Sequence, residues 1–249
     1  MKAVLRWLLL VVLAGMAVQL YFVGRIALMA VVDPQSTAFQ RSEAWRLAVE
    51  KRELKWRQQW VPYAELSSNL KRAVIASEDA TFVEHEGVDL EALEKAWEKN
   101  IRAEQRAEQA ASRLSSRAAP ARSARPAKIV GGSTITQQLA KNLFLSGERT
   151  LMRKGQELLL TLLLEALLSK QRILEIYLNN VEWGEGVFGA EAAAQHYYRK
   201  PAAKLNAYEA ARLAVMLPRP RYFETRPGSG YLASRASTIA ARMGGVEVP

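Results

Sequence analysis

The chain has 249 residues, enough for one good hydrophobic core or two small ones, and its hydrophobic content of 49% is typical of a folded protein. It contains no cysteine, which excludes disulfide bonds, thiolate metal sites and cysteine nucleophiles. The formal net charge of +10 indicates a polyanionic partner, such as nucleic acid, anionic lipid headgroups or a phosphorylated substrate.

The amino-terminal segment predicts a membrane anchor. Residues 7–24 read WLLLVVLAGMAVQLYFVG, in which Gln19 is the one clearly polar residue, and as a helix they would span roughly 27 Å. Lys2 and Arg6 precede this run, which predicts that the amino end stays in the cytoplasm. A cleaved signal peptide is the alternative, but the run is longer than a usual signal core and no clean cleavage site follows it. We therefore expect an uncleaved anchor over residues 1–32, with the rest of the chain outside the cytoplasm and away from nucleic acid.

The rest of the chain is predicted to be helical, since it has no run of alternating β-branched residues of the kind found in sheet proteins. We expect an all-α domain over residues 61–249, with a stalk over residues 33–60 leading into it. The helices expected in this domain cover residues 63–80, 89–100, 131–145, 150–170, 172–183, 190–198 and 206–217. From Pro218 onward the prolines break the helical pattern, and a loose carboxyl end is expected.

An insert over residues 103–128 separates two of these helices and is rich in Ala, Arg and Ser, with two prolines. This composition predicts a solvated or disordered basic loop. Such a loop could be attracted to anionic lipid, but an insertion without an essential role is the favoured interpretation.

Three local patterns match known sites only in isolation. GEGVFG at residues 184–189 fits the dinucleotide-binding motif, but the segment before it is expected to be helical and no βαβ alternation surrounds it. SNLK at residues 68–71 begins like a penicillin-binding transpeptidase site, but the partner K-T-G and S-D-N motifs are absent. The two histidines, His85 and His196, lack the ligand spacing of a zinc site.

Residues 75–89, IASEDATFVEHEGVD, concentrate five carboxylates in a basic protein. On a helical wheel Glu78 lies at the edge of the apolar face of residues 66–77, whereas Asp79 points about 100° further round. Glu78 should therefore be partly desolvated, which raises its pKa toward that of a proton-transfer group. A structural hydrogen bond inside the fold explains Glu78 equally well at this point. We interpret Asp79 and His85 as structural supports of the turn.

A polar stripe follows one side of the Leu-rich helix expected over residues 150–170. Arg153 and Glu157 are four residues apart in it, which by itself predicts an ordinary helix salt bridge. A cluster of cations across this helix and the one before it suits a diphosphate, since Arg gives bidentate contacts and Lys a point charge. This cluster consists of Lys141, Arg149, Arg153 and Lys154. Gln137 and Gln138 lie one helical turn before its first lysine and could hydrogen-bond a sugar or a phosphate, although helix surface is the commoner fate of glutamine.

Four segments resemble, in order, the successive signature motifs of the peptidoglycan glycosyltransferases of glycosyltransferase family 51. They are AVIASEDATFVEHEGVD (73–89), GGSTITQQLAKNLFL (131–145), RKGQE (153–157) and RILEIYLNNVEWGEGVFGAEAAAQHYY (172–198). One such motif would be a weak signal, but four in order behind an anchor are specific. Because the chain stops where bifunctional penicillin-binding proteins continue, it resembles a monofunctional member of the family.

The resemblance implies an all-α, lysozyme-like glycosyltransferase domain behind an N-terminal transmembrane helix, in the bacterial inner membrane with the catalytic domain periplasmic. The substrate would be lipid II, a disaccharide-pentapeptide on undecaprenyl diphosphate, and the nascent glycan strand would be the donor. The acceptor's GlcNAc 4-hydroxyl would attack C1 of the donor's MurNAc, with inversion and loss of undecaprenyl diphosphate. Membrane lipids and proteins of cell division or elongation are further expected partners.

The family's motif positions also imply roles for residues of this chain. Glu78 matches the general base that takes the hydroxyl proton. Glu157 matches a second glutamate that helps the diphosphate to leave, directly or by holding a divalent cation such as Mg²⁺ or Mn²⁺, and no organic cofactor is expected. The cations that match diphosphate-binding positions are Lys141, Arg149, Arg153 and Lys154. Positive charge there would stabilise the negative charge that develops on the leaving group.

The chain departs from the family pattern in two places. The insert at residues 103–128 is longer than the usual link, and Tyr198-Arg199 stands where Phe-Gly is common, which should change packing rather than chemistry.

Two other hypotheses stay open. A lysozyme-like glycan-cleaving enzyme, such as a lytic transglycosylase, needs no diphosphate-binding cluster. A non-catalytic membrane-anchored scaffold leaves Glu78 and Glu157 without a role.

Overall fold

The computed structural model describes residues 2–115, 132–145 and 150–249, and nearly all of its regular structure is helical, which confirms the all-α prediction. The α-helices are α1 (Lys2–Leu28), α2 (Ala38–Arg46), α3 (Ser68–Glu78), α4 (Leu90–Ser115), α5 (Ile135–Phe144), α6 (Leu151–Leu167), α7 (Lys170–Asn180), α8 (Ala190–Tyr198), α9 (Ala207–Met216), α10 (Pro220–Glu224) and α11 (Gly230–Arg242). Shorter helical turns are a π-helical turn at Leu47–Lys51 and 3₁₀ turns at Tyr63–Glu65, Ala202–Lys204 and Met243–Gly245.

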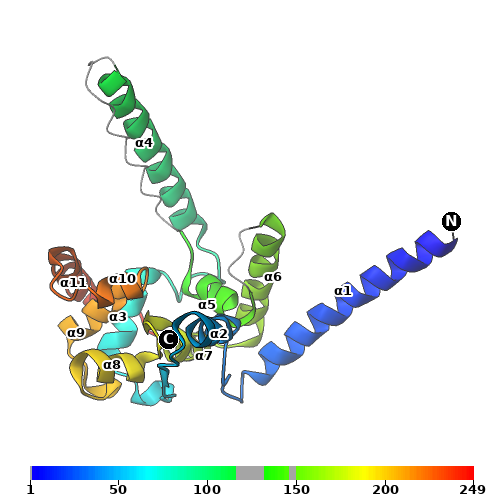
Figure 1. The fold of residues 1–249 in the computed structure, drawn as a ribbon, viewed down its shortest axis with the longest axis horizontal. Coiled ribbons are helices and arrows are strands. Elements are labelled where there is room, and N and C mark those ends of the chain that lie inside the picture. The colour runs from blue at the N-terminus through cyan, green and yellow to red at the C-terminus, as the bar shows by residue number, and fades with distance from the viewer. Residues whose placement is uncertain (1, 116–131, 146–149) are drawn as a thin grey trace.

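Helix α1 projects from the body of the molecule with the N-terminus at its far tip (Figure 1). Among the described residues it is the one helix long and apolar enough to cross a membrane. Near its carboxyl end it packs on α6, where Gln19 and Gln156 exchange side-chain hydrogen bonds of 3.2 and 3.3 Å. This contact accounts for the one polar residue in the apolar run, because each amide supplies the hydrogen-bond partner of the other.

The segment between the anchor and residue 61 packs on the domain. Thr37 and Gln40 form a capping box that starts α2, and the buried Gln40 side chain also donates to the carbonyl oxygen of Asn180 at 3.3 Å. Further on, the segment supplies the short strand β1 (Arg57–Gln58) to the sheet described below. Residues 33–60 therefore lead from the anchor into the domain and also contact it.

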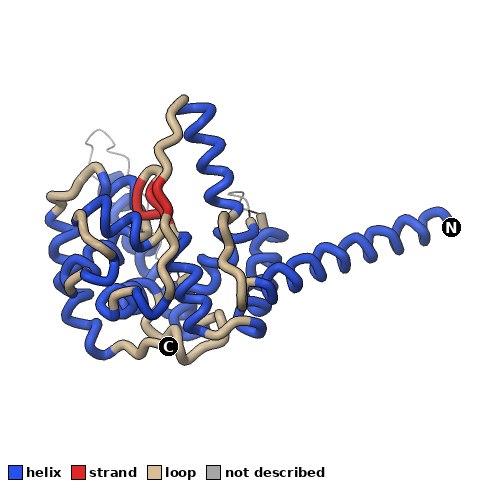
Figure 2. Tube along the Cα trace, turned by 90° about the horizontal axis from the view of Figure 1, so that it is seen from below, coloured by secondary structure: helices blue, strands red, loops and turns tan. Residues whose placement is uncertain are grey.

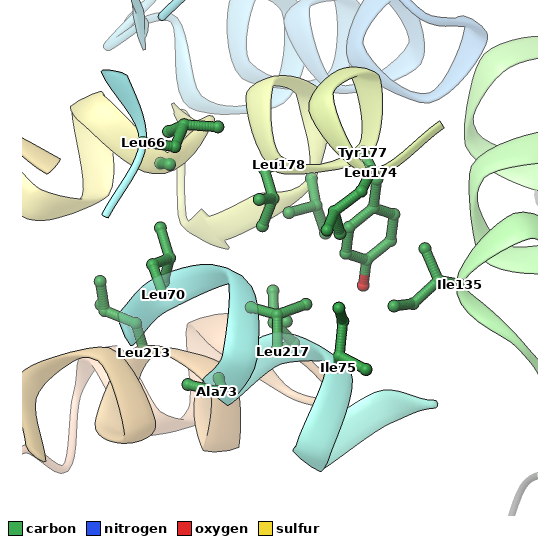
Figure 3. Close-up of a cluster of buried hydrophobic side chains, with 14 of the residues drawn as sticks. Leu66, Leu70, Ala73, Ile75, Ile135, Leu174, Tyr177, Leu178, Leu213 and Leu217 are labelled. Atoms are coloured by element: carbon green, nitrogen blue, oxygen red, sulfur yellow. The ribbon is translucent and has the colours of Figure 1, made fainter. Parts of the chain in front are cut away.

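The hydrophobic core centres on α3. Its buried side chains face α7 on one side and α9 on the other (Figure 3). Helix α11 packs on α9 and completes the part of the core on that side. The residues labelled in this cluster are Leu66, Leu70, Ala73, Ile75, Ile135, Leu174, Tyr177, Leu178, Leu213 and Leu217. Burying a leucine of this kind contributes about 2 kcal/mol. The core positions α3, α5 and α7, and α6 packs on α5, so these four helices carry most of the polar groups of the site.

A small sheet, drawn in red in Figure 2, has the strand order β1–β3–β2. Strand β2 (Glu182–Gly184) pairs antiparallel with β3 (Val187–Phe188), and β1 pairs parallel with β3. The GEGVFG motif therefore forms a tight antiparallel hairpin followed by α8. Helix α7 ends earlier than expected, so a strand does precede the motif, but the antiparallel hairpin is not the βαβ unit that a dinucleotide site requires.

The prediction of a loop from residue 103 onward is wrong for residues 103–115. They continue α4, which extends away from the body (Figure 1), while residues 116–128 of the insert lie outside the described residues. Ala, Glu, Gln and Arg dominate this stretch, and these are strong helix formers whose propensity outweighs the low-complexity character.

The predicted loose carboxyl end is also wrong. Pro220 occupies the first turn of α10, where a proline's missing N–H has no intrahelical partner to lose. In α11 the fully buried residues Leu232, Ala236 and Ile239 recur at helical spacing and pack into the core. Pro220 thus begins α10, and Pro218 and Pro227 lie between helices, so the prolines do not end the folded domain.

The hairpin turn depends on Gly186, which has a φ of +71°, and a Cβ there would lie 1.9 Å from the carbonyl oxygen of Lys55. We expect Gly186→Ala to destabilise the protein by about 3 kcal/mol or more, since it combines backbone strain with a backbone clash. Gly155 in the second turn of α6 has open space around it, so Gly155→Ala should stabilise by about 0.5–1 kcal/mol. Thermal unfolding of both variants in detergent tests the pair, and equal midpoints would contradict this steric argument.

Candidate active site

Glu78 is the last residue of α3, whose first turn is capped by the side chain of Ser67. Its Oε1 accepts a hydrogen bond from the Ser77 hydroxyl at 3.2 Å, and its Oε2 accepts one from the amide of Gln138 at 3.1 Å. Burial raises the pKa of Glu78, while the two hydrogen bonds and the charge of Arg235 on α11 oppose that rise. Glu78 is therefore a carboxylate with raised proton affinity, which suits a proton-transfer group.

Glu78 lines a hollow of about 340 Å³ between the end of α3, the start of α4 and the segment before α5. The other charged residues lining it are Asp79, Asp89, Glu91, Lys95 and Lys99. With Glu78, four carboxylates and two lysines line this hollow, so it suits a hydroxyl-bearing group better than an anionic one.

Asp79 follows α3 and supports the turn behind Glu78. Its Oδ1 lies 2.8 Å from Nε2 of His85, and its Oδ2 accepts the backbone N–H of Ile135 at 2.9 Å. Because His85 Nδ1 accepts the backbone N–H of Gly87 at 3.1 Å, it is Nε2 that donates to Asp79. Asp79 thereby ties the segment after α3 to the first turn of α5.

The helical wheel placed Asp79 pointing away from the apolar face, and this was wrong. Asp79 is only 7% exposed, because α3 ends at Glu78 and the backbone of Asp79 leaves the helical region with φ −164° and ψ 74°. A wheel does not extend past the end of its helix, and the chain turns this carboxylate inward.

Ligand atoms of Asp79, His85 and Asp89 lie within 4.8 Å of one another, a grouping that the sequence spacing did not reveal. Each side chain already has a protein partner, since Asp89 accepts the hydroxyl of Thr81 at 2.6 Å and the N–H of Ala92 at 2.7 Å. These two hydrogen bonds also lower the pKa of Asp89. The contacts account for the three residues as a hydrogen-bonded turn, and no metal is assigned to them.

A second hollow, of about 470 Å³, lies between α5, α6 and the start of the β2–β3 hairpin. Glu157 on α6 is 4% exposed and faces two cations. Its Oε2 accepts from Arg153 at 3.0 Å, and its Oε1 is paired with Lys154. The ion pair predicted between Arg153 and Glu157 is present, and Lys154 pairs with the same carboxylate.

The structure brings together six of the residues predicted to act on the diphosphate side of the reaction, all lining this second hollow: Gln137, Gln138, Lys141, Arg153, Lys154 and Glu157. Arg149, the remaining predicted cation, lies outside the described residues. Gln137 has a structural task as well, because its Oε1 accepts the backbone N–H of Thr134 in the capping box that starts α5. The cationic lining makes the hollow suitable for a phosphorylated group.

Sequence reasoning missed Glu182 on β2, which also lines the second hollow. Burial raises its pKa to about 7, although Arg221 on α10 donates to its carboxylate at 2.8 Å and opposes the rise. Arg221 also pairs with Glu43 on α2 at 2.5 Å. No pattern in the sequence marks these charged residues as neighbours, because they come from three distant segments, α2, β2 and α10.

Glu182 should make stability depend on pH. A folded-state pKa of about 7, above the usual glutamate value, stabilises the fold below that usual value and loses this stabilisation as the pH rises toward neutrality. A shift of this size corresponds to roughly 3 kcal/mol. We expect Glu182→Gln to flatten the decrease in thermal midpoint between about pH 5 and pH 8. An unchanged decrease in the variant would assign it to other groups.

The two hollows adjoin each other. Ser133 lines both, and Gln138 lines the second while its amide reaches Glu78 in the first. The first turn of α5 therefore separates a carboxylate with raised proton affinity from a cation-lined cleft.

Residues 47–244 match a family model described as Transglycosylase. A protein of Burkholderia thailandensis named biosynthetic peptidoglycan transglycosylase is 53% identical over 252 residues, which cover 100% of this chain and 90% of that protein. Proteins of the same name from Burkholderia pseudomallei and Burkholderia orbicola are each 52% identical, over 100% and 95% of this chain and 90% and 87% of those proteins. The chain therefore belongs to the transglycosylase family and has an all-α, lysozyme-like fold.

Proposed function

We propose that this chain polymerises lipid II into the glycan strands of peptidoglycan, at the outer surface of the bacterial cytoplasmic membrane. As a member of its family it is a peptidoglycan glycosyltransferase. The observation that carries the more detailed proposal is the position of Gln138, which lines the cation-rich hollow and hydrogen-bonds Glu78 in the adjoining one. The donor's diphosphate would then lie on one side of the first turn of α5, and the acceptor's hydroxyl would lie on the other side, next to Glu78.

In the proposed reaction the nascent strand is the donor and lipid II is the acceptor. Lys141, Arg153 and Lys154 hold the donor's diphosphate, and Glu78 accepts the proton of the acceptor's GlcNAc 4-hydroxyl. The hydroxyl oxygen bonds to C1 of the donor's MurNAc with inversion, while the bond from C1 to the diphosphate oxygen breaks. Undecaprenyl diphosphate leaves with the electron pair, and the cations stabilise its charge.

Glu157 is proposed to hold the cations in place for the leaving group. Both of its carboxylate oxygens contact a cation, Arg153 or Lys154, so a divalent metal ion would have to displace one of them. This donor set fits a diphosphate approaching the two cations better than it fits Mg²⁺ or Mn²⁺. No step of the proposed reaction runs through a metal.

The membrane anchor supports this placement of the substrate. Helix α1 contacts α6, and α6 exposes an apolar surface that includes Leu151, Met152, Leu158, Leu159 and Leu162. Such a surface beside an anchor suits the lipid boundary, where the diphosphate of a lipid-linked donor lies. Lys2 and Arg6 favour a cytoplasmic N-terminus and hence a periplasmic domain. Proteins of cell division or elongation are proposed partners on the ground of the resemblance alone.

Purified full-length protein with labelled lipid II in detergent and a divalent cation tests the proposal. Products longer than one disaccharide, formed as undecaprenyl diphosphate is released, are expected. Shortening of preformed glycan strands with no new polymer would instead identify a glycan-cleaving enzyme and overturn it. Binding of lipid II without any product would favour the scaffold hypothesis.

A further inference from the structure

Among its described contacts, the side chain of Gln138 touches one phenol, that of Tyr177, and it also touches Glu78. Tyr177 lies on α7 with its side chain fully buried, and Figure 3 shows its hydroxyl pointing away from α7 toward the space between Ile75 and Ile135. The hydroxyl donates to Oε1 of Gln138 at 3.0 Å. A buried phenol in an apolar cluster is costly unless it has a partner, and Gln138 is that partner.

The two ends of the Gln138 amide are nearly alike in shape, so their neighbours decide which end faces which way. Burial raises the pKa of Tyr177 well above its usual value, so the phenol stays protonated and is a donor. Oε1 of Gln138 is therefore held toward Tyr177, and Nε2 is left to donate to Oε2 of Glu78 at 3.1 Å. Turning the amide round would place two acceptors face to face at the ionised Glu78, and it would take away from the buried Tyr177 hydroxyl the acceptor that it has in the described contacts.

We propose that Tyr177 is a positioning residue for Glu78, because its hydroxyl fixes the Gln138 amide with the NH₂ group facing the carboxylate. This inference rests on the proposed role of Glu78 as the base. An NH₂ donor stabilises the ionised carboxylate, which is the form that can accept a proton, and holds one of its oxygens in place. Tyr177 itself touches no substrate.

Other groups also face Glu78 and must stay constant in a test. Asp79 next to it raises the pKa of Glu78, while Ser77 and Arg235 lower it, after burial as the largest cause. The charged residues that share its hollow are Asp79, Asp89, Glu91, Lys95 and Lys99. Tyr177→Phe leaves all of these in place and removes a single oxygen, so it isolates the contact to Gln138.

The test measures strand synthesis from lipid II by full-length Tyr177→Phe protein in detergent across a range of pH. Without the phenol the amide can turn or drift, so the acidic limb of the rate profile should move to higher pH by roughly one unit or more. Rates on that limb should then fall about 10-fold, recover toward the wild-type value at alkaline pH, and leave KM within about twofold. An unmoved limb with a uniformly lower rate would overturn the proposal in favour of a packing role.

Tyr63→Phe is a matched control, because the Tyr63 hydroxyl donates to the carbonyl oxygen of Pro249 at 2.6 Å, away from both hollows. It should change stability to a similar degree and leave the pH profile in place. A double-mutant cycle with Gln138→Met adds a second measurement. If Tyr177 acts through Gln138, adding Tyr177→Phe to Gln138→Met should move the limb no further, and an additive shift would contradict the proposed route.

These outcomes can be separated from failure of the proposed function. If Glu78→Gln retains activity and the same acidic limb, Glu78 is not the base and the reaction scheme fails. If Glu78→Gln is inactive but Tyr177→Phe keeps the wild-type limb, the base stands and only the role of Tyr177 is lost.

Discussion

Replacing Glu78 by glutamine should slow strand synthesis by about 100- to 10,000-fold, the range expected for loss of a general base. Glutamine keeps the size of the side chain at the end of α3 and its place beside Ser77 and Gln138. It cannot accept the proton of the acceptor hydroxyl, so the attacking oxygen would have to lose that proton to water. Initial rates of lipid II polymerisation by the purified full-length variant measure the effect.

The same substitution should not weaken the fold at neutral pH. Burial raises the pKa of Glu78, so its contribution to stability is fully present below the usual glutamate value and is lost as the pH rises through the folded-state value. An uncharged glutamine avoids that loss. The thermal midpoint of Glu78→Gln should therefore equal or exceed that of the wild type at about pH 8, in the opposite direction to activity.

Glu191→Gln is the matched control for Glu78→Gln. Glu191 is a buried carboxylate on α8 that lines neither hollow and accepts hydrogen bonds from Gln195 at 2.9 Å and from the Ala202 N–H at 2.7 Å. Its replacement should lower the thermal midpoint and leave the rate near the wild-type value. Near-normal synthesis by Glu78→Gln, with synthesis lost in the control, would place the base elsewhere.

Features that depend on a few neighbouring residues could be predicted from the sequence. The capping box that starts α5 is one such feature, because its two partners, Thr134 and Gln137, lie within one turn of each other. The pair of Arg153 and Glu157 forms for the same reason, since residues four apart share a helix face. The long apolar helix α1 can be predicted from the length and composition of its segment, without knowledge of the tertiary structure.

Features that depend on distant segments could not be predicted. The contact of Tyr177 with Gln138 joins residues 39 apart, and so does the pair of Arg221 with Glu182. In each case the sequence shows two unremarkable polar residues, and the packing of α5 on α7 or of α10 on β2 creates the site. The orientation of the Asp79 side chain could not be predicted for a related reason. The residue at which α3 ends decides whether that carboxylate faces water or the core.

Replacing Glu157 by glutamine should reduce synthesis by about 100-fold or more, because the carboxylate organises the two cations proposed to meet the diphosphate. With glutamine at this position, Arg153 and Lys154 lose their charged partner and repel each other, so their preferred positions spread. Since the leaving group gains its charge beside them, kcat should fall more than KM rises. Steady-state rates over a range of lipid II concentrations separate the two parameters.

Glu165→Gln provides the control for this last substitution, because Glu165 lies about two turns further along α6 and its side chain is buried to a similar degree. It pairs with Lys170 at 2.9 Å and accepts the Thr136 hydroxyl at 2.5 Å, yet it does not line the cation-rich hollow. Both variants should lose comparable stability, since each takes a buried carboxylate of α6 out of an ion pair, with Arg153 and Lys154 for Glu157 and with Lys170 at the start of α7 for Glu165. If Glu165→Gln lost as much kcat as Glu157→Gln at a temperature where both are folded, the effect would belong to α6 as a whole. A loss confined to Glu157→Gln would support a specific role of Glu157 in stabilising the departing diphosphate.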